Sequence, residues 1–357
     1  ASIITGAIEG TLGNEVLRHF KVTFDYANRK FWTQHAPLET VAELLARKGD
    51  INAADFIGVT PLMRTQRVEE AKELLARGAR VNARTITGYT PLISAAAGGP
   101  ELVKLLIERG ADIKAVAKSG VNALLRASMD APPETVRLLL SSGAKANVPN
   151  NEGVTCLMLA ALRGNAEICK ILIDAKADVK TADKTGRTAL MRAVWLGDRK
   201  TIELLLTGGA DINRPDKSGV TPLMTAATGW NVETISLLIA EGADLSRVDA
   251  DGWRAIHHAA KSGNQPAFAR LVKHGSDINT TTPRGLSCLH IAATTGHADM
   301  IRYLAGKLSL SVKAGGLWGE SPLMHAVSYP NPETVQAVLD AGASINAADK
   351  DGATPLI

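Results

Sequence analysis

The sequence predicts an all-α repeat solenoid, a stack of helix-turn-helix units with hairpin fingers, preceded by a small β-hairpin and helix segment. The main observation is a unit of about 33 residues. A glycine marks each unit, at Gly58, Gly88, Gly120, Gly153, Gly186, Gly219, Gly252, Gly285, Gly319 and Gly352. The spacings are 30, 32, five of 33, 34 and 33 residues. A fixed period of this size is typical of units that bury a shared core by stacking.

The second observation is the pattern inside each unit, for which the unit from Gly219 serves as the example. Thr221 is placed to cap a first helix, and Pro222 at its first position gives up an N–H that would be unpaired there. A second helix has apolar residues at three- and four-residue spacing and ends at Gly242, which suits a left-handed C-cap. Residues 243–252 are rich in turn formers and should cross to the next unit as a hairpin finger.

Two short signatures recur with the units. Thr-Pro-Leu occupies residues 60–62, 90–92, 221–223 and 354–356, and Gly-Ala-Asp occupies residues 110–112, 209–211 and 242–244. These motifs resemble those of the ankyrin repeat family, and the resemblance covers residues 37–357. It implies one ankyrin repeat domain with nine full repeats from Gly58 to Lys350 or Asp351 and a partial repeat at each end.

One departure from the family pattern is systematic. The His that follows Thr-Pro-Leu in the family is present only as His257 and His290. The other full repeats have an apolar residue there: Met63, Ile93, Leu125, Met158, Met191, Met224 and Met324. An imidazole that ties neighbouring repeats is thereby exchanged for apolar packing, which a thioether provides well. Because His257 and His290 occupy the structural position, we interpret them as structural rather than as zinc ligands.

Residues 1–36 do not follow the repeat. Residues 14–20 suggest a short helix, and residues 21–26 and 30–32 suggest a β-hairpin. The segment resembles the C-terminal end of the retropepsin-like aspartic protease domains of bacterial proteins, with Thr-Leu-Gly at residues 11–13 in place of that family's hydrophobic-hydrophobic-Gly motif. The alternative is an unrelated cap that shields the first repeat.

The sequence gives no support for catalysis by this chain. The protease family carries its catalytic Asp in an Asp-Thr-Gly or Asp-Ser-Gly loop, because two such carboxylates must share a proton and activate a water. Neither tripeptide occurs here, nor does Cys-x-x-Cys, His-Glu-x-x-His or a phosphate-cradling Gly loop. We therefore predict no enzyme, no catalytic residue, no metal site and no cofactor. Since position 1 is Ala rather than Met, we interpret the chain as a piece of a longer protein.

Composition narrows the class of partner. The chain has 45% hydrophobic and 21% charged residues and a net charge of +4, without an apolar run of 18 residues. The positive charge is diffuse and forms no basic cluster. We therefore expect no membrane span, no nucleic-acid partner and a monomer. The three cysteines, Cys156, Cys169 and Cys288, lie at helix positions expected to pack inside as free thiols.

The resemblance also locates a partner surface, because finger tips and first helices line a concave groove in ankyrin proteins. Of the nine tryptophans and tyrosines in the chain, five fall on such positions. Together with two arginines, the predicted partner-binding residues are Tyr89, Arg163, Arg187, Trp195, Trp253, Trp318 and Tyr329. Aromatic side chains dominate interface hot spots, and arginines supply forked donors for carboxylates, a role also expected of Arg192.

We therefore predict a non-catalytic protein-protein interaction scaffold that binds a protein or peptide of apolar and acidic character. Trp253 and Trp318 are expected to contribute most, whereas Trp195 and Trp230 have the alternative of wedging between repeats. The alternative function is the substrate-recruiting or regulatory arm of a larger retropepsin-like aspartic protease whose catalytic loop lies upstream of this chain.

Overall fold

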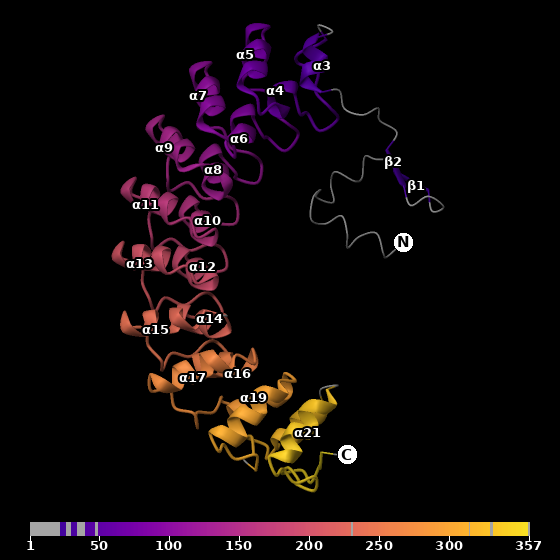
Figure 1. Ribbon diagram of the computed structural model, residues 1–357, viewed down its shortest axis with the longest axis vertical. Helices are drawn as coiled ribbons and strands as arrows, with labels where there is room; N and C mark the ends of the chain where they lie inside the picture. Colours follow the sequence, from indigo (N-terminus) through magenta and orange to yellow (C-terminus); the bar gives the residue numbers. More distant parts are fainter. Residues whose placement is uncertain are drawn as a thin grey trace. The chain divides into compact units, whose positions relative to one another are not determined.

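The computed structural model describes residues 22–25, 30–33, 40–46, 49–229, 231–313, 315–328 and 331–355. The chain divides into two compact units, Ala1–Ala144 and Lys145–Ile357, and each is described by itself. Figure 1 labels their helices and strands. The helix expected at residues 14–20 lies outside the described residues.

Unit 1 contains a β-hairpin and a series of helix pairs. Strands β1 (Val22–Asp25) and β2 (Lys30–Thr33) pair antiparallel, with Phe24 opposite Phe31 in the register, which confirms the predicted hairpin. The helices are α3 (Val41–Ala46), α4 (Pro61–Arg64), α5 (Val68–Ala76), α6 (Pro91–Ala95), α7 (Pro100–Glu108), α8 (Ala123–Asp130) and α9 (Pro133–Ser141).

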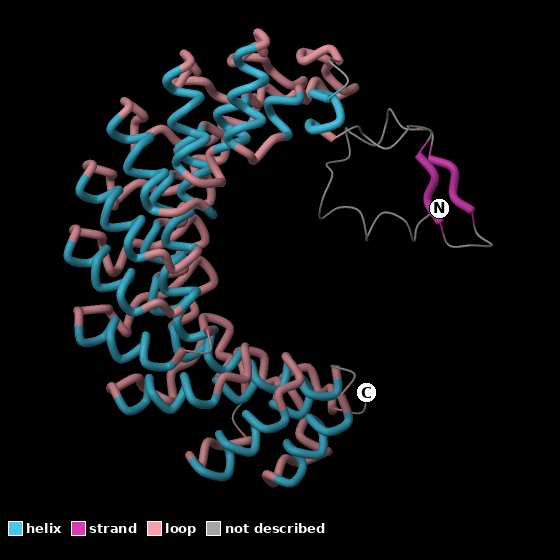
Figure 2. The backbone as a smooth tube through the Cα atoms, turned by 45° about the horizontal axis from the view of Figure 1, so that its top comes forward, coloured by secondary structure: helices cyan, strands magenta, loops and turns pink. Residues whose placement is uncertain are grey.

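Unit 2 alternates first helices, which follow the finger glycines, with second helices. The first helices are α10 (Cys156–Leu162), α12 (Ala189–Leu196), α14 (Pro222–Thr228), α16 (Ala255–Lys261), α18 (Cys288–Thr294) and α20 (Pro322–Val327). The second helices are α11 (Ala166–Asp174), α13 (Arg199–Thr207), α15 (Val232–Ala240), α17 (Gln265–Lys273), α19 (Ala298–Arg302), which continues as a π-helical turn (Tyr303–Lys307), and α21 (Pro332–Asp340). Each first helix packs on the next first helix and on its own second helix, and Figure 2 shows loops joining the helices. The predicted all-α repeat solenoid is confirmed.

The caps form as the sequence predicts. The hydroxyl of Thr221 accepts a hydrogen bond from the backbone N–H of Met224 at 3.3 Å, and Pro222 occupies the first turn of α14. Gly242 ends the neighbouring second helix with φ +95°. Gly219 in the finger also has positive φ, and a Cβ there would lie 2.7 Å from the Cα of Asp249 in the next finger. Glycine therefore allows the second helix to end and the fingers to stack.

The fingers are turns, and two of them contain an isolated antiparallel bridge, between Val116 and Asn122 and between Ala182 and Thr188. In the finger before α16, one carboxylate oxygen of Asp249 accepts from the N–H groups of Asp251 and Trp253, and the Asp249 N–H donates to the Trp253 carbonyl at 3.0 Å. The tip also donates from Ala250 N–H to the carbonyl of Ser218 in the preceding finger at 2.9 Å. These bonds close this finger and join it to the preceding one.

The core of unit 2 lies between the helix layers. Leu223, Ile235 and Leu238 are at most 1% exposed. The three cysteines are also buried, as predicted, and burial raises the pKa of Cys169 and Cys288 to about 12. Among the described residues, no helix has the length and apolar character needed to traverse a bilayer.

Candidate partner-binding site

A pocket of about 360 Å³ opens among the first helices of unit 2. We call it the inner pocket. It is lined by Leu162, Arg187, Met191, Arg192, Trp195, Asp216, Val220, Met224, Thr225, Thr228 and His258. These residues come from α10, α12, α14 and α16 and from the fingers that precede α12 and α14. The wall therefore combines apolar side chains with two arginines, one carboxylate and one imidazole.

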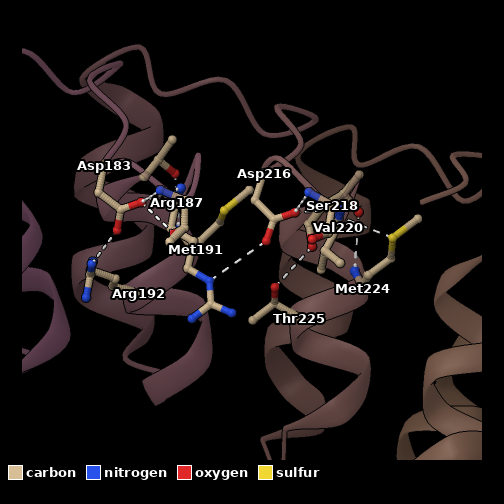
Figure 3. Close-up of polar contacts among 12 residues, drawn as sticks. Asp183, Arg187, Met191, Arg192, Asp216, Ser218, Val220, Met224 and Thr225 are labelled. Carbon is tan, nitrogen blue, oxygen red and sulfur yellow. Dashed lines mark hydrogen bonds and ion pairs between the residues drawn. The ribbon is translucent and has the colours of Figure 1, made fainter. Parts of the chain in front are cut away.

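The finger carboxylates are fixed by the backbone, and Asp183 shows the usual arrangement. Its Oδ1 accepts from the N–H groups of Thr185 and Arg187 at 2.8 and 3.0 Å. Its Oδ2 accepts from the guanidinium of Arg192 at 2.6 Å (Figure 3). These hydrogen bonds lower the pKa of Asp183 and outweigh its burial, which is the largest single influence and acts to raise it. Asp183 and Arg192 thus form a closed ion pair beside the pocket.

Asp216 departs from this arrangement. Its Oδ1 accepts from the N–H groups of Ser218 and Val220 at 2.9 and 3.0 Å, so the turn is the same (Figure 3). The residue nine positions after Asp216 is Thr225, whereas the residue nine positions after Asp183 is Arg192. The Thr225 hydroxyl donates to the carbonyl of Thr221 at 3.1 Å. The Oδ2 of Asp216 is therefore not held by its own first helix.

The nearest cation to Asp216 comes from the preceding finger. The Nε of Arg187 lies 3.8 Å from Asp216 Oδ2, which is beyond hydrogen-bond distance. The Asp216 side chain is only 9% exposed, whereas that of Arg187 is 63% exposed. Such an exposed partner is screened by water and holds the carboxylate weakly.

His258 of α16 lines the pocket and belongs to a polar and aromatic cluster that extends beyond it. His258 Nε2 donates to Asp249 Oδ2 at 2.8 Å. The indole of Trp253 meets the rings of His257 and His258 edge to face, at centroid distances of 6.3 and 6.0 Å, and the ammonium of Lys261 lies 5.3 Å from the indole centroid. Burial lowers the pKa of His258 although Asp249 acts in the opposite direction, so the imidazole is neutral at pH 7.

The structure distributes the predicted partner-binding residues unevenly. It brings Arg187 and Trp195 together on the wall of the inner pocket, and Trp195 is 63% exposed rather than wedged between repeats. Arg163 is exposed directly after Leu162 of the pocket. Arg192, expected to offer donors to a partner, is instead bound to Asp183.

The other predicted residues lie outside the inner pocket. Trp253 is half-buried against His257 and His258, so much of its ring already packs within the fold. Trp318 is 57% exposed in the finger before α20. Tyr89 is half-buried in unit 1. Tyr329 and Trp230 lie outside the described residues.

Sequence reasoning missed Asp216 and Thr225 as site residues. The signal was present in the sequence. Asp55, Asp183 and Asp249 are each followed nine residues later by Arg or His, whereas Asp216 is followed there by Thr225. Within the described parts of the chain, no cluster of three or more His, Cys, Asp or Glu side chains is arranged to hold a metal ion.

Comparison with known protein families agrees with this architecture. A family model for ankyrin repeats in three copies matches residues 33–117, 124–216, 208–282 and 271–349. Comparison with curated proteins gave no match. The family matches cover most of the chain, and the helix pairs and stacked fingers have the periodicity that they require. The chain therefore belongs to the ankyrin repeat family.

Proposed function

We propose that this chain is a non-catalytic scaffold that binds a protein or peptide, and that the inner pocket is part of its binding surface. The observation that carries the proposal is Trp195, a large aromatic side chain that is 63% exposed on the rim of a pocket. Exposed apolar surface beside a concavity is typical of interaction sites, and tryptophan is the residue most enriched in interface hot spots.

The helix that carries Trp195 is rigidly held. Thr188 caps α12 by accepting from the N–H of Met191 at 3.3 Å, and Asp183 binds Arg192 on the same helix. A partner would therefore meet a side chain on a helix that is already ordered, which lowers the entropic cost of binding. This favours Trp195 as the central contact.

The remaining predicted residues extend the proposed surface beyond the pocket. The exposure of Trp318 supports its inclusion, whereas the packing of Trp253 on the α16 histidines supports a smaller role than the sequence suggested. Contacts by Arg163 and Tyr329 rest on their repeat positions, and Tyr89 is a separate predicted contact in unit 1.

The test compares two tryptophans that are similarly exposed. Wild-type protein, Trp195→Ala and Trp318→Ala are used to recover partners from extracts of the source cell, and recovered proteins are quantified by mass spectrometry. Loss of a hot-spot tryptophan costs about 2 kcal/mol, or roughly thirtyfold in affinity, so Trp195→Ala should lose its partners. Loss with Trp318→Ala as well would extend the surface to that finger.

Thermal unfolding of the same variants serves as the control, because both side chains are exposed and should change the melting temperature little. Equal recovery by all three proteins would refute the assignment of the partner surface to these tryptophans. Unfolding of Trp195→Ala would instead assign its side chain to the core.

A second candidate, the regulatory or substrate-recruiting arm of a retropepsin-like protease, rests on the sequence resemblance of residues 1–36; the β1–β2 hairpin is compatible with it and with an unrelated cap. It predicts an Asp-Thr-Gly or Asp-Ser-Gly loop upstream in the gene and peptidase activity of the longer product. Substitution of that loop Asp should abolish cleavage while leaving partner recovery unchanged. A gene without such a loop would overturn this candidate alone.

A further inference from the structure

Three fingers of the chain share a pairing across nine residues. Asp55 accepts from Arg64 at 3.0 Å in unit 1, and Asp183 accepts from Arg192 at 2.6 Å in unit 2. The third pair joins Asp249, in the finger before α16, to His258 on α16, at 2.8 Å. In each case Oδ1 of the aspartate accepts from N–H groups of the turn, and Oδ2 accepts from a nitrogen donor on the first helix. This position is therefore built to hold a donor.

At Asp216 the place of that donor is open. Thr225 is too short to reach across and uses its hydroxyl on Thr221. Both Asp216 and Thr225 line the inner pocket. The pocket thus lies where a neighbouring repeat places an arginine side chain. It is lined by Asp216, whose side chain is 9% exposed and whose Oδ2 has no donor from its own first helix.

We propose that the inner pocket binds an arginine side chain of the partner, with the guanidinium donating to Asp216 Oδ2 and the side-chain stem lying against Trp195. This inference rests on the proposed function and names the chemistry of the partner. A guanidinium has donors that suit a carboxylate, and the methylene stem of arginine packs well on apolar and aromatic surfaces. Met191 and Met224 supply such a wall.

The charges around the pocket support a cationic ligand. Of the polar groups that line the pocket, Arg192 is bound to Asp183 and the neutral His258 to Asp249. Asp216 has only a weak ion pair, with the exposed Arg187 at 3.8 Å. The acidic partner expected from the sequence would have to approach Asp216, whereas an arginine would complete a pairing that the chain already makes three times.

Removal of the Arg187 side chain should change the affinity for a basic peptide and for an acidic peptide in opposite directions. Because its Nε lies 3.8 Å from Asp216 Oδ2, it competes with an incoming cation. Arg187→Ala should therefore tighten the binding of a basic peptide several-fold. If the partner were acidic, the same substitution would weaken binding.

The experiment selects displayed random 12-residue peptides on the full chain and, in parallel, on Thr225→Arg. The new arginine should pair with Asp216 and fill the pocket, so peptides selected on the wild-type chain should share an arginine and should not bind this variant. Fluorescence anisotropy of a synthetic selected peptide should show at least tenfold weaker binding when citrulline, a neutral group of the same shape, replaces its arginine.

Two further variants keep the test decisive. Asp216→Asn should weaken the arginine peptide at least tenfold while preserving the turn, because Asn150 forms the same turn in its own finger, with bonds of 2.9 Å from Glu152 and Val154. Ser94→Arg is the matched control, since it places an arginine at the same repeat position where the finger has Thr85 rather than Asp. It should leave binding unchanged.

The outcomes separate the two proposals. Selected peptides that share Asp or Glu, or that bind wild type and both Asp216→Asn and Thr225→Arg equally, would overturn the arginine inference and leave a peptide-binding scaffold in place. Weaker binding of the arginine peptide to Arg187→Ala would also overturn it. Failure to select any peptide would count against the proposed function itself.

Discussion

The third residue of the first helix is methionine in α12 and α14 but histidine in α16 and α18. This difference gives two ways of joining neighbouring repeats. The first pair has Met191 and Met224, both of which line the inner pocket. Met224 Sδ accepts a hydrogen bond from the N–H of Thr221 at 3.4 Å, but a thioether cannot donate one to the next repeat. The second pair has His257 and His290, which are fully buried.

The two histidines bond in both directions. His257 Nδ1 accepts from the N–H of Arg254 at 3.0 Å, and its Nε2 donates to the carbonyl of Thr280 at 3.2 Å. His290 likewise accepts from Ser287 N–H and donates to the carbonyl of Glu320 at 2.9 Å. The histidine repeats are thus tied to the following finger by a polar bond, whereas the methionine repeats are joined there by apolar packing that also forms a pocket wall. The same position therefore binds neighbouring repeats together in the histidine repeats and lines the inner pocket in the methionine repeats.

The largest expected effect comes from removing a histidine tie. His290→Ala loses hydrogen bonds at both ring nitrogens and leaves a cavity, and should lower the free energy of unfolding by about 3 kcal/mol. Met224→Leu, the matched change in a methionine repeat, should cost about 1 kcal/mol or less. Urea unfolding followed by circular dichroism measures both. Equal costs would remove the distinction between the two kinds of repeat.

Acid should loosen the histidine repeats before the methionine repeats. Burial lowers the pKa of His257 and His258 in the folded state below the ordinary value of about 6.5. Below that pH the unfolded chain binds more protons than the folded chain. The stabilising contribution is therefore complete above about pH 6.5 and is lost as the pH falls towards the folded-state pKa values, at about 1.4 kcal/mol for each unit by which a pKa is lowered.

Hydrogen exchange at pH 7.5 and pH 5.5, corrected for intrinsic rates, locates this effect. Amides of α16 should lose more protection than those of α12 and α14, which contain no histidine. A uniform loss across these helices would show that the buried imidazoles do not set the local response to acid.

The smallest effect should come from backbone strain at the end of α11, in a methionine repeat. Lys176 has φ +65°, whereas the glycines that follow other second helices, such as Gly209 and Gly242, have φ +90° and +95°. Lys176→Gly should therefore stabilise the chain by about 1 kcal/mol. Thermal unfolding tests this, with Gly209→Ala as the reverse change; a Cβ there meets no atom within 4 Å, so only backbone strain is measured. A lower melting temperature for Lys176→Gly would contradict the expectation.

The fold was predictable because period, caps and finger glycines are local features of the chain. Thr221, Gly242 and the β1–β2 hairpin all behave as their sequence context predicts. The site was less predictable, since exposure depends on neighbours in space. Repeat position alone ranked Trp253 above Trp195, but Trp253 packs on His257 and His258, whereas Trp195 remains 63% exposed.

The inner pocket was hidden for a different reason. It depends on a side chain that is short, Thr225, at a place where a neighbouring repeat has Arg192. A search for aromatic and charged residues misses a short polar side chain such as that of Thr225. The difference lies in the partners of two equivalent carboxylates, since Asp183 is bound by Arg192 and Thr225 binds Thr221 instead of Asp216.

The bonds between consecutive fingers bear on how this family member could change its specificity. Three consecutive tips of unit 2 are joined to the preceding finger by main-chain atoms: Lys184 to Glu152 at 2.9 Å, Lys217 to Thr185 at 3.0 Å and Ala250 to Ser218 at 2.9 Å. A main-chain bond is indifferent to the side chain of its donor, provided that the donor is not proline. The tips can therefore exchange one side chain for another while the attachment survives, and the rows of exposed lysine and alanine tips are a surface on which new recognition could evolve, or be engineered, independently of the stack beneath.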